Sequence, residues 1–314
     1  MHCFGGLYMK KDLLKMDDLS KEEILDILNL ADQLKYEHKH GIEHHHLKGK
    51  SLGMIFEQSS TRTRVSFEAG MYQLGGNSLF LSDRDLQIGR GEPIEDTARV
   101  LSRFLQGIMI RTFSQEEAET LAKYSSIPII NGLTDAEHPC QVLADLMTIR
   151  ENKNILEGLK VAFIGDGNNM ANSLMIGCLK VGMNFSVASP KEYTASEQYL
   201  NRAKEIAEKE GVNFTVTASP SEAASGADVL ITDVWASMGH EEEAETRAKA
   251  FEGFQINKEL MAVADKNVMV LHCLPAHRGE EITAEVLEEN ADSIFDESEN
   301  RLHAQKAVLV RLIK

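Results

Sequence analysis

The sequence predicts an α/β protein made of two parallel-sheet domains of similar size that are joined by interdomain helices. Short apolar runs alternate with longer amphipathic segments from about residue 50, and the same alternation begins again near residue 160. This rhythm is typical of strands that pair in parallel through helical crossovers. A length of 314 residues, of which 43% are hydrophobic, is enough for two domains of ordinary size.

The first half begins with an amphipathic helix over residues 12–35, in which Ser20 and Glu23 have the spacing of a capping box. Residues 38–46 (HKHGIEHHH) contain several imidazoles, but no second cluster of ligands accompanies them, so we interpret this segment as a solvated loop and not as a metal site. Strands are expected in SLGMIF, SLFL, GIMI and SIPII, each followed by a helix.

The second half repeats the pattern, with strands expected in LKVAFIG, FSVAS, FTVTA, DVLITD and VMVLH. Residues 137–151 predict a helix that links the halves, and residues 299–312 are apolar at helical spacing. We therefore expect one domain over residues 1–148, a second over residues 149–298 with a cleft between them, and a terminal helix, residues 299–314, that packs back onto the first domain.

The composition indicates that the binding partners are small molecules. A formal charge of −16 disfavours nucleic acid, because an acidic surface repels its phosphates. No apolar run approaches the roughly 20 residues of a spanning helix, and the first residues lack a secretion signal, so we expect a cytosolic protein without membrane contact. The cysteines are scattered and are expected to be free thiols: Cys3, Cys140, Cys178 and Cys273.

An anion site is predicted where the first strand meets the next helix. The turn STRTR combines the hydroxyls of Ser60, Thr61 and Thr63 with the Arg62 guanidinium and the free amides of a helix start. The simpler alternative is a capped helix with solvated arginines. Arg111 and the segment His138–Gln141 favour the anion site, because both follow strands, and ligands of parallel sheets bind at the carboxyl ends of strands.

Four motifs together give this chain a resemblance to the transcarbamoylase family: STRTR at 60–64, HPCQ at 138–141, DVWASMG at 233–239 and HCLP at 272–275. Their order and spacing match from about residue 10 to residue 314. The resemblance implies two groups of residues that bind carbamoyl phosphate: the phosphate is held by Ser60, Thr61, Arg62 and Thr63, and the carbonyl and amide by Arg111, His138 and Gln141.

The same resemblance implies further contacts with the reacting groups. Cys273 would touch the reacting nitrogen, and a cis Leu274–Pro275 peptide would aim the Leu274 carbonyl at the substrate. Arg301 would return to the phosphate. The loop carrying Gln87 would reach the active site of a neighbouring subunit, which requires a homo-oligomer, expected as a trimer or an assembly of trimers.

The second half presents the turn GDGNNMANS, which begins like a dinucleotide-binding fingerprint. It departs from that fingerprint because Met170 occupies the third glycine position and no acid ends the strand FSVAS, so we reject a nicotinamide dehydrogenase. The amides of Asn168 and Asn169 can instead bind an amino-acid head group. Asp233, which ends another strand, suits an ammonium.

The ornithine branch of the family uses the matching positions Asn169, Asp233, Ser237 and Met238 for the α-amino and α-carboxylate groups. The resemblance thus implies transfer of a carbamoyl group to the side-chain amine of L-ornithine, giving citrulline and phosphate in arginine metabolism, without metal or organic cofactor. Our hypothesis is that Cys273, coupled to Asp233, receives or relays the proton that the ammonium must lose. The alternatives are another amine acceptor, such as putrescine, and a non-catalytic homologue that regulates a partner.

Overall fold

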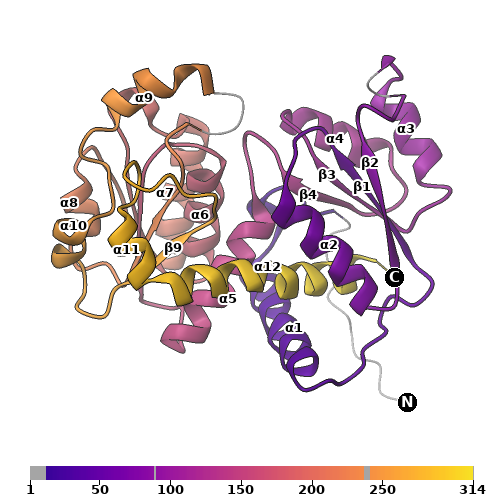
Figure 1. The fold of residues 1–314 in the computed structure, drawn as a ribbon, viewed down its shortest axis with the longest axis horizontal. Helices are drawn as coiled ribbons and strands as arrows, with labels where there is room; N and C mark the ends of the chain where they lie inside the picture. Colours follow the sequence, from indigo (N-terminus) through magenta and orange to yellow (C-terminus); the bar gives the residue numbers. More distant parts are fainter. Residues whose placement is uncertain (1–11, 88–89, 237–240, 314) are drawn as a thin grey trace. The chain divides into compact units, whose positions relative to one another are not determined.

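The computed structural model describes residues 12–87, 90–236 and 241–313. The chain forms two compact units: unit 1 contains Met1–Thr134 and His303–Lys314, and unit 2 contains Asp135–Leu302. Each unit is built on one sheet in which all strands run parallel, with helices packed around it (Figure 1). The predicted fold class, two parallel-sheet α/β domains, is confirmed.

The units divide the chain at places that differ from the boundaries drawn from sequence. Unit 1 ends at Thr134 and not near residue 148, because the connecting helix α5 (Pro139–Lys153) packs against α6 (Asn169–Lys180) within unit 2. The last helix, α12 (Ala291–Leu312), begins earlier than residue 299 and continues from unit 2 into unit 1 at His303.

Unit 1 holds a sheet of four strands in the order β2-β1-β3-β4. The strands are β1 (Ser51–Phe56), β2 (Asn77–Ser82), β3 (Gly107–Arg111) and β4 (Ile129–Leu133), at the four predicted sites. The accompanying helices are η1 (Met16–Asp18), α1 (Lys21–Lys39), α2 (Thr61–Gln73), α3 (Ile94–Leu101) and α4 (Gln115–Tyr124). Apolar side chains of β1, β3 and α4, among them Ile55, Ile108 and Leu121, form part of its buried core.

The first helix is shorter at its start than the predicted range of residues 12–35. The Ser20 side chain accepts a hydrogen bond from the Glu23 amide at 3.2 Å, and the Glu23 carboxylate accepts one from the Ser20 amide at 2.8 Å. This confirms the capping box, and because the box satisfies the first free amides, the helix begins at Lys21.

The histidine-rich segment is only partly a solvated loop. Helix α1 extends into it as far as Lys39, and His44 is buried instead of solvated. The reason is a polar contact from α12, since the Lys306 ammonium lies 2.7 Å from His44 Nε2 and also donates to the Gln73 carbonyl oxygen at 2.9 Å.

Unit 2 holds a five-stranded sheet in the order β7-β6-β5-β8-β9. The strands are β5 (Lys160–Ile164), β6 (Asn184–Ala188), β7 (Phe214–Thr217), β8 (Val229–Thr232) and β9 (Met269–His272), at the five predicted sites. Besides α5, α6 and α12, the helical segments are η3 (Lys191–Tyr193), α7 (Glu197–Glu210), α8 (Pro220–Ala224), η4 (Glu241–Glu243), α9 (Ala244–Ala250), α10 (Lys258–Val263) and α11 (Ala284–Glu289).

The strand order of unit 2 places its polar loops at one edge. β5 is central, with β6 on one side and β8 on the other, so the order of connection reverses there. Because all the strands are parallel, the segments that follow β5, β8 and β9 emerge at the same carboxyl edge, where open α/β sheets bind ligands. Over the described part of the chain, no helix has the length and apolar character needed to cross a membrane.

Candidate active site

The turn between β1 and α2 has the chemistry of an anion site in unit 1. Ser60 is the N-cap of α2, and its hydroxyl oxygen accepts a hydrogen bond from the Thr63 amide at 3.2 Å. The first turn contains no acidic residue, so the positive end of the helix dipole is not neutralised locally. Thr61 is exposed, Arg62 is half-buried and Thr63 is buried at this helix start.

Arg111 lies at the same sheet edge as this turn. Phe56, the last residue of β1, pairs with Arg111, the last residue of β3, and the Arg111 carbonyl accepts a hydrogen bond from the Glu57 amide at 2.9 Å. Gln58, in the turn itself, donates through Nε2 to the Thr112 carbonyl at 3.2 Å. The structure therefore brings Arg111 and the STRTR turn together at adjacent strand ends.

An acidic residue that the sequence analysis missed lies at this edge. The Glu57 carboxylate accepts a hydrogen bond from the Thr112 hydroxyl at 2.5 Å, and the same hydroxyl contacts the Glu117 carboxylate. Burial, together with the neighbouring charge of Glu117, raises the pKa of Glu57 to about 6. Its signal in the sequence was only its position directly after β1.

Gln87 lies on the exposed surface of unit 1. Its carbonyl accepts hydrogen bonds from the amides of Arg90 at 2.8 Å and Glu92 at 3.0 Å. Its role toward a neighbouring subunit stays a prediction.

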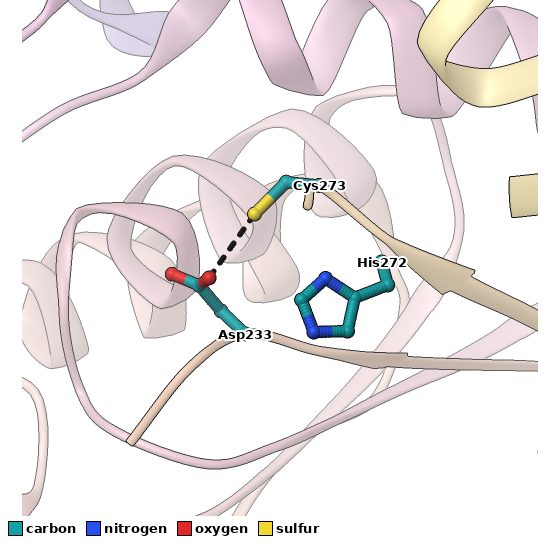
Figure 2. Close-up of side chains that lie close together, drawn as sticks. All are labelled: Asp233, His272 and Cys273. Carbon is teal, nitrogen blue, oxygen red and sulfur yellow. Dashed lines mark hydrogen bonds between the residues drawn. The ribbon is translucent and has the colours of Figure 1, made fainter. Parts of the chain in front are cut away.

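Asp233 and Cys273 meet at the carboxyl edge of unit 2. Thr232 of β8 pairs with His272 of β9, so the next residue of each strand emerges at the same point. Figure 2 shows the Cys273 thiol directed at the Asp233 carboxylate, and the Sγ atom donates to Oδ1 at 3.1 Å. The Val234 amide donates to the same oxygen at 2.8 Å, which fixes the carboxylate.

Asn168 orients Asp233. Its predicted contact with an amino-acid head group stays a prediction. Its Nδ2 donates to Asp233 Oδ2 at 2.8 Å, while its Oδ1 accepts from the amides of Met170 and Ala171 as the N-cap of α6. Asn169, the first residue of α6, is half-buried. The other two predicted ornithine ligands, Ser237 and Met238, lie outside the described residues.

The Cys273 thiol is protonated at neutral pH. Burial raises its pKa well above the ordinary value, and the nearby charge of Asp233 raises it further. The S–H group is therefore a hydrogen-bond donor to Asp233 in the resting chain.

His272 holds the segment that follows β9. Its Nδ1 accepts a hydrogen bond from the Leu274 amide at 2.9 Å, so the proton is on Nε2, which donates to the buried Glu281 carboxylate at 2.9 Å. The Leu274–Pro275 peptide is cis, as the resemblance implied. Although the ligand atoms of Asp233, His272 and Cys273 are close enough for a metal ion, these hydrogen bonds already engage them.

His138 is placed by residues of α6 that no motif had indicated. It is the N-cap of α5, and its amide donates to the Ser173 hydroxyl at 2.8 Å. Ser173 in turn donates to the Glu137 carboxylate at 2.7 Å, and Asn172 donates to the Ala136 carbonyl at 3.1 Å. These bonds fix the backbone that leads into α5 and hence the position of the His138 ring.

Gln141 and Arg301 are both buried and belong to one network in unit 2. Arg301 donates through Nη1 to the Gln141 carbonyl oxygen at 2.7 Å. The amide nitrogen of Gln141 donates to Asp145 and to Glu297, each at 2.8 Å. Sequence reasoning selected Gln141 and Arg301 through the family motif, but it missed the two acids, which lie within helices without a local signal.

Two further features explain the polar turn after β5. Gly167 lies so close to the backbone of residues 194 and 195 that a Cβ there would lie 2.1 Å from the Ala195 nitrogen, so packing of the chain requires this glycine. Arg247 of α9 donates to Asp166 at 2.7 Å, to the Trp235 carbonyl at 3.0 Å and to Glu243 at 3.0 Å. It therefore connects this turn with the segments on both sides of residues 237–240.

Comparison with known proteins gives this arrangement a context. A family model described as the carbamoyl-P binding domain of aspartate/ornithine carbamoyltransferase matches residues 11–151, and the model of the Asp/Orn binding domain matches residues 157–312. The chain belongs to the aspartate/ornithine carbamoyltransferase family. The resemblance based on four short motifs is thereby confirmed over nearly the whole chain.

Individual members of the family are similar throughout their length. Ornithine carbamoyltransferase of Syntrophotalea carbinolica is 57% identical over 97% of this chain and 100% of its own. The solved ornithine carbamoyltransferase of Pyrococcus furiosus superposes with a TM-score of 0.93 at 50% identity, covering 96% of this chain and 97% of its own. The anabolic enzyme of Campylobacter jejuni gives 0.92 at 45% identity, covering 96% and 99%.

Proposed function

We propose that this chain is an enzyme that transfers the carbamoyl group of carbamoyl phosphate to the side-chain amine of L-ornithine, producing L-citrulline and phosphate. The observation that carries the proposal is the Cys273–Asp233 pair, a protonated thiol bonded to a fixed carboxylate at the ligand-binding edge of unit 2. The full-length similarity to ornithine carbamoyltransferases supports the choice of substrates.

Carbamoyl phosphate is the donor, and the STRTR turn supplies what its phosphate needs. The turn places hydroxyl residues and Arg62 at a helix start that carries no acid, and a hydrogen bond to a charged group is worth roughly 1.5–3 kcal/mol. In the proposal Arg111, His138 and Gln141 bind the carbonyl and amide, and Arg301 and Leu274 complete the donor site. Donors fixed near the carbonyl stabilise the negative oxygen charge that develops during attack.

The acceptor must lose a proton before it can attack. A free alkyl ammonium has a pKa near 10.4, so it is almost fully protonated at neutral pH. Because the Cys273 thiol is itself protonated, we propose the relay version of our hypothesis: the thiol passes its proton to Asp233 and takes one from the ornithine side chain.

The remaining bond changes complete the transfer. The neutral amine attacks the carbonyl carbon, the new C–N bond forms, and the C–O bond to phosphate breaks. The departing phosphate takes the second proton of the former ammonium, and the proton left on Asp233 passes to solvent, so charge and protons balance. Asn169, Asp233, Ser237 and the Met238 backbone hold the α-amino and α-carboxylate groups in this proposal.

Assembly and location form the last part of the proposal. Gln87 is exposed, which supports the proposal that it reaches the active site of a neighbouring subunit. We therefore propose a homotrimer, alone or within a larger assembly. We also propose that the enzyme works in the cytoplasm in arginine metabolism, because the relatives include an enzyme described as anabolic.

The decisive experiment offers carbamoyl phosphate labelled with ¹³C to the purified protein together with one amine at a time: ornithine, putrescine, N-acetylornithine or aspartate. The proposal predicts a ¹³C-ureido signal of citrulline with ornithine and rates at least about 100-fold lower with the others, because a site built to bind polar groups rejects analogues that lack them. If putrescine reacts faster than ornithine, putrescine is the substrate. If no amine is carbamoylated, the chain is a non-catalytic homologue.

A further inference from the structure

Two buried carboxyl groups, Asp145 of α5 and Glu297 of α12, lie side by side in unit 2. Both are almost fully excluded from solvent, and both accept a hydrogen bond from the same Gln141 amide group. Neither takes part in the reaction as described above. Two ionised carboxylates in such a place would repel each other and would lack the solvation that stabilises their charge.

Charge balance allows only one of them to be ionised. Among the described residues, Arg301 is the cation that joins this network, through its bond to the Gln141 oxygen. The other titratable groups coupled to the pair are the acid Asp233 and the thiols of Cys178 and Cys273, none of which adds a positive charge. One carboxylate is compensated by Arg301, and the second carboxyl must carry a proton.

Hydrogen bonding identifies where the proton lies. Asp145 Oδ1 accepts from Gln141, but Asp145 Oδ2 is buried and receives no N–H or hydroxyl from the part of the chain that is described. Glu297 lies beside Asp145, since the same Gln141 nitrogen is 2.8 Å from an oxygen of each carboxyl. Burial, the charge of Asp145 and a hydrogen bond with it raise the pKa of Glu297. A proton on Glu297 therefore supplies the donor that Asp145 lacks.

We propose that Glu297 and Asp145 share one proton, and that this acid pair positions Gln141 as a hydrogen-bond acceptor for the carbamoyl amide. The pair takes both N–H groups of the Gln141 side chain, and Arg301 takes one lone pair of its oxygen. The hydrogen-bonding position of Gln141 that remains is the second lone pair of the same oxygen. It matches the NH₂ group of a carbamoyl donor, so this step rests on the proposed function.

Glu297 also connects this network to the strand before Cys273. Its second oxygen accepts a hydrogen bond from the His272 amide at 2.8 Å. One proton thus fixes two features. The first is the Gln141 side chain, which is proposed to bind the donor amide, and the second is the end of β9. Glu297 and Asp145 are positioning residues, because they act through Gln141 and the β9 backbone.

Infrared spectroscopy at about pH 8 tests the shared proton directly. The wild-type protein is expected to show a protonated-carboxyl band that disappears in Glu297→Gln. The band should also disappear in Asp145→Asn, because Glu297 then ionises to balance Arg301. The control Asp296→Asn, an exposed acid on the same helix, should keep the band. A band that survives in Asp145→Asn, or no band in the wild type, would overturn the proposal.

Kinetics test the positioning role separately. Either single variant keeps one carboxylate beside Arg301, so each should lower kcat/KM for carbamoyl phosphate by about tenfold or less. The double variant keeps no carboxylate there, and its kcat/KM for carbamoyl phosphate should fall by at least about 1000-fold, which is more than the product of the single effects. The KM for ornithine should change less. Strictly multiplicative losses would refute the role. If the wild type forms no citrulline, the proposed function fails while the infrared result still decides the acid pair.

Discussion

Asp233 receives hydrogen bonds from three segments of unit 2: the Cys273 thiol, the Asn168 amide and the backbone of Val234. These bonds occupy both carboxylate oxygens and fix the side chain before any substrate binds. A group that is held in this way loses little further freedom when it acts, which favours a role in orienting the substrate and in proton transfer.

Replacing Cys273 by alanine tests the proton relay at this residue. General acid–base groups contribute roughly 10²–10⁴-fold to rates, so kcat should fall by at least about 100-fold at neutral pH and recover in part at high pH, where free amine is more abundant. The measurement is citrulline formation across pH. Cys178→Ala, which removes another buried thiol, is the matched control. Wild-type turnover by Cys273→Ala at every pH would refute the relay.

Asp233→Asn tests the charge instead of the thiol. The substitution keeps the shape of the side chain but removes the negative charge that would attract the α-ammonium, at a cost of about 1.5–3 kcal/mol for a charged hydrogen bond. Because Asn cannot take the relayed proton either, we expect kcat/KM for ornithine to fall by at least roughly 100-fold, with a smaller effect on the KM for carbamoyl phosphate. An equal loss for both substrates would contradict a specific role in acceptor binding.

Helix starts position several of the proposed ligands: Ser60 is the N-cap of α2, His138 is the N-cap of α5 and Asn169 is the first residue of α6. The His138 start depends on Ser173 of the neighbouring helix, which accepts from the His138 amide and donates to Glu137. The arrangement of α5 against α6 is thus part of the site as well as part of the core.

Ser173→Ala should therefore affect both stability and catalysis. The variant leaves a buried amide and a buried carboxylate without their partner, which costs about 1–3 kcal/mol each. We expect a lower denaturation midpoint and a raised KM for carbamoyl phosphate, measured on the same preparation. Ser221→Ala on α8, an exposed serine, should change neither quantity. A destabilised variant with unchanged kinetics would show that Ser173 only supports the fold.

The end of α12 contributes a pH-dependent term to unit 1. Burial lowers the pKa of Lys306 from 10.5 to about 8. Between these values the unfolded chain binds more protons than the folded one, so the contribution of this lysine to stability rises with pH over that window. Below about pH 8 both states are protonated, and the cost of burying the charge is fully present.

Comparison with Lys306→Met isolates this term. The variant removes the buried charge. Its denaturation midpoint should therefore exceed that of the wild type by the largest amount near pH 7.5, and this difference should disappear near pH 10. Denaturant titrations at several pH values provide the measurement. A difference between the two proteins that stays constant across this range would contradict the lowered pKa.

The local sequence pattern predicts the strands and the motif residues. It does not predict the distant residues that hold the motif residues in place. β1 to β9 were found because short apolar runs bounded by polar turns repeat along the chain, and the Ser20 capping box is a local signal. Asp145 and Glu297 are 152 positions apart in the sequence, inside helices, and no local pattern marks them as a pair. The burial of His44 likewise depends on Lys306, which is contributed by a distant helix.

At the scale of the whole molecule, the proposed role of Gln87 requires a neighbouring subunit. Mixing the variants Gln87→Ala and Cys273→Ala tests the shared site, because a hybrid oligomer contains sites with an intact Gln87 from one subunit and an intact Cys273 from another. We expect activity to rise above that of either variant after the two variants are dissociated and reassembled together. Reassembled mixtures no more active than the separate variants would contradict sharing between subunits.

The central claim is that the STRTR turn of unit 1 binds the phosphate of the donor, while Asp233 of unit 2 binds the acceptor. Calorimetric binding of the unreactive phosphonate analogue of carbamoyl phosphate, in which CH₂ replaces the bridging oxygen, tests this claim most directly. Arg62→Gln should weaken binding by at least roughly tenfold, since it removes a charged hydrogen bond, while Asp233→Asn should bind within about twofold of the wild type. Unchanged affinity in Arg62→Gln, or equal weakening in both variants, would contradict the account.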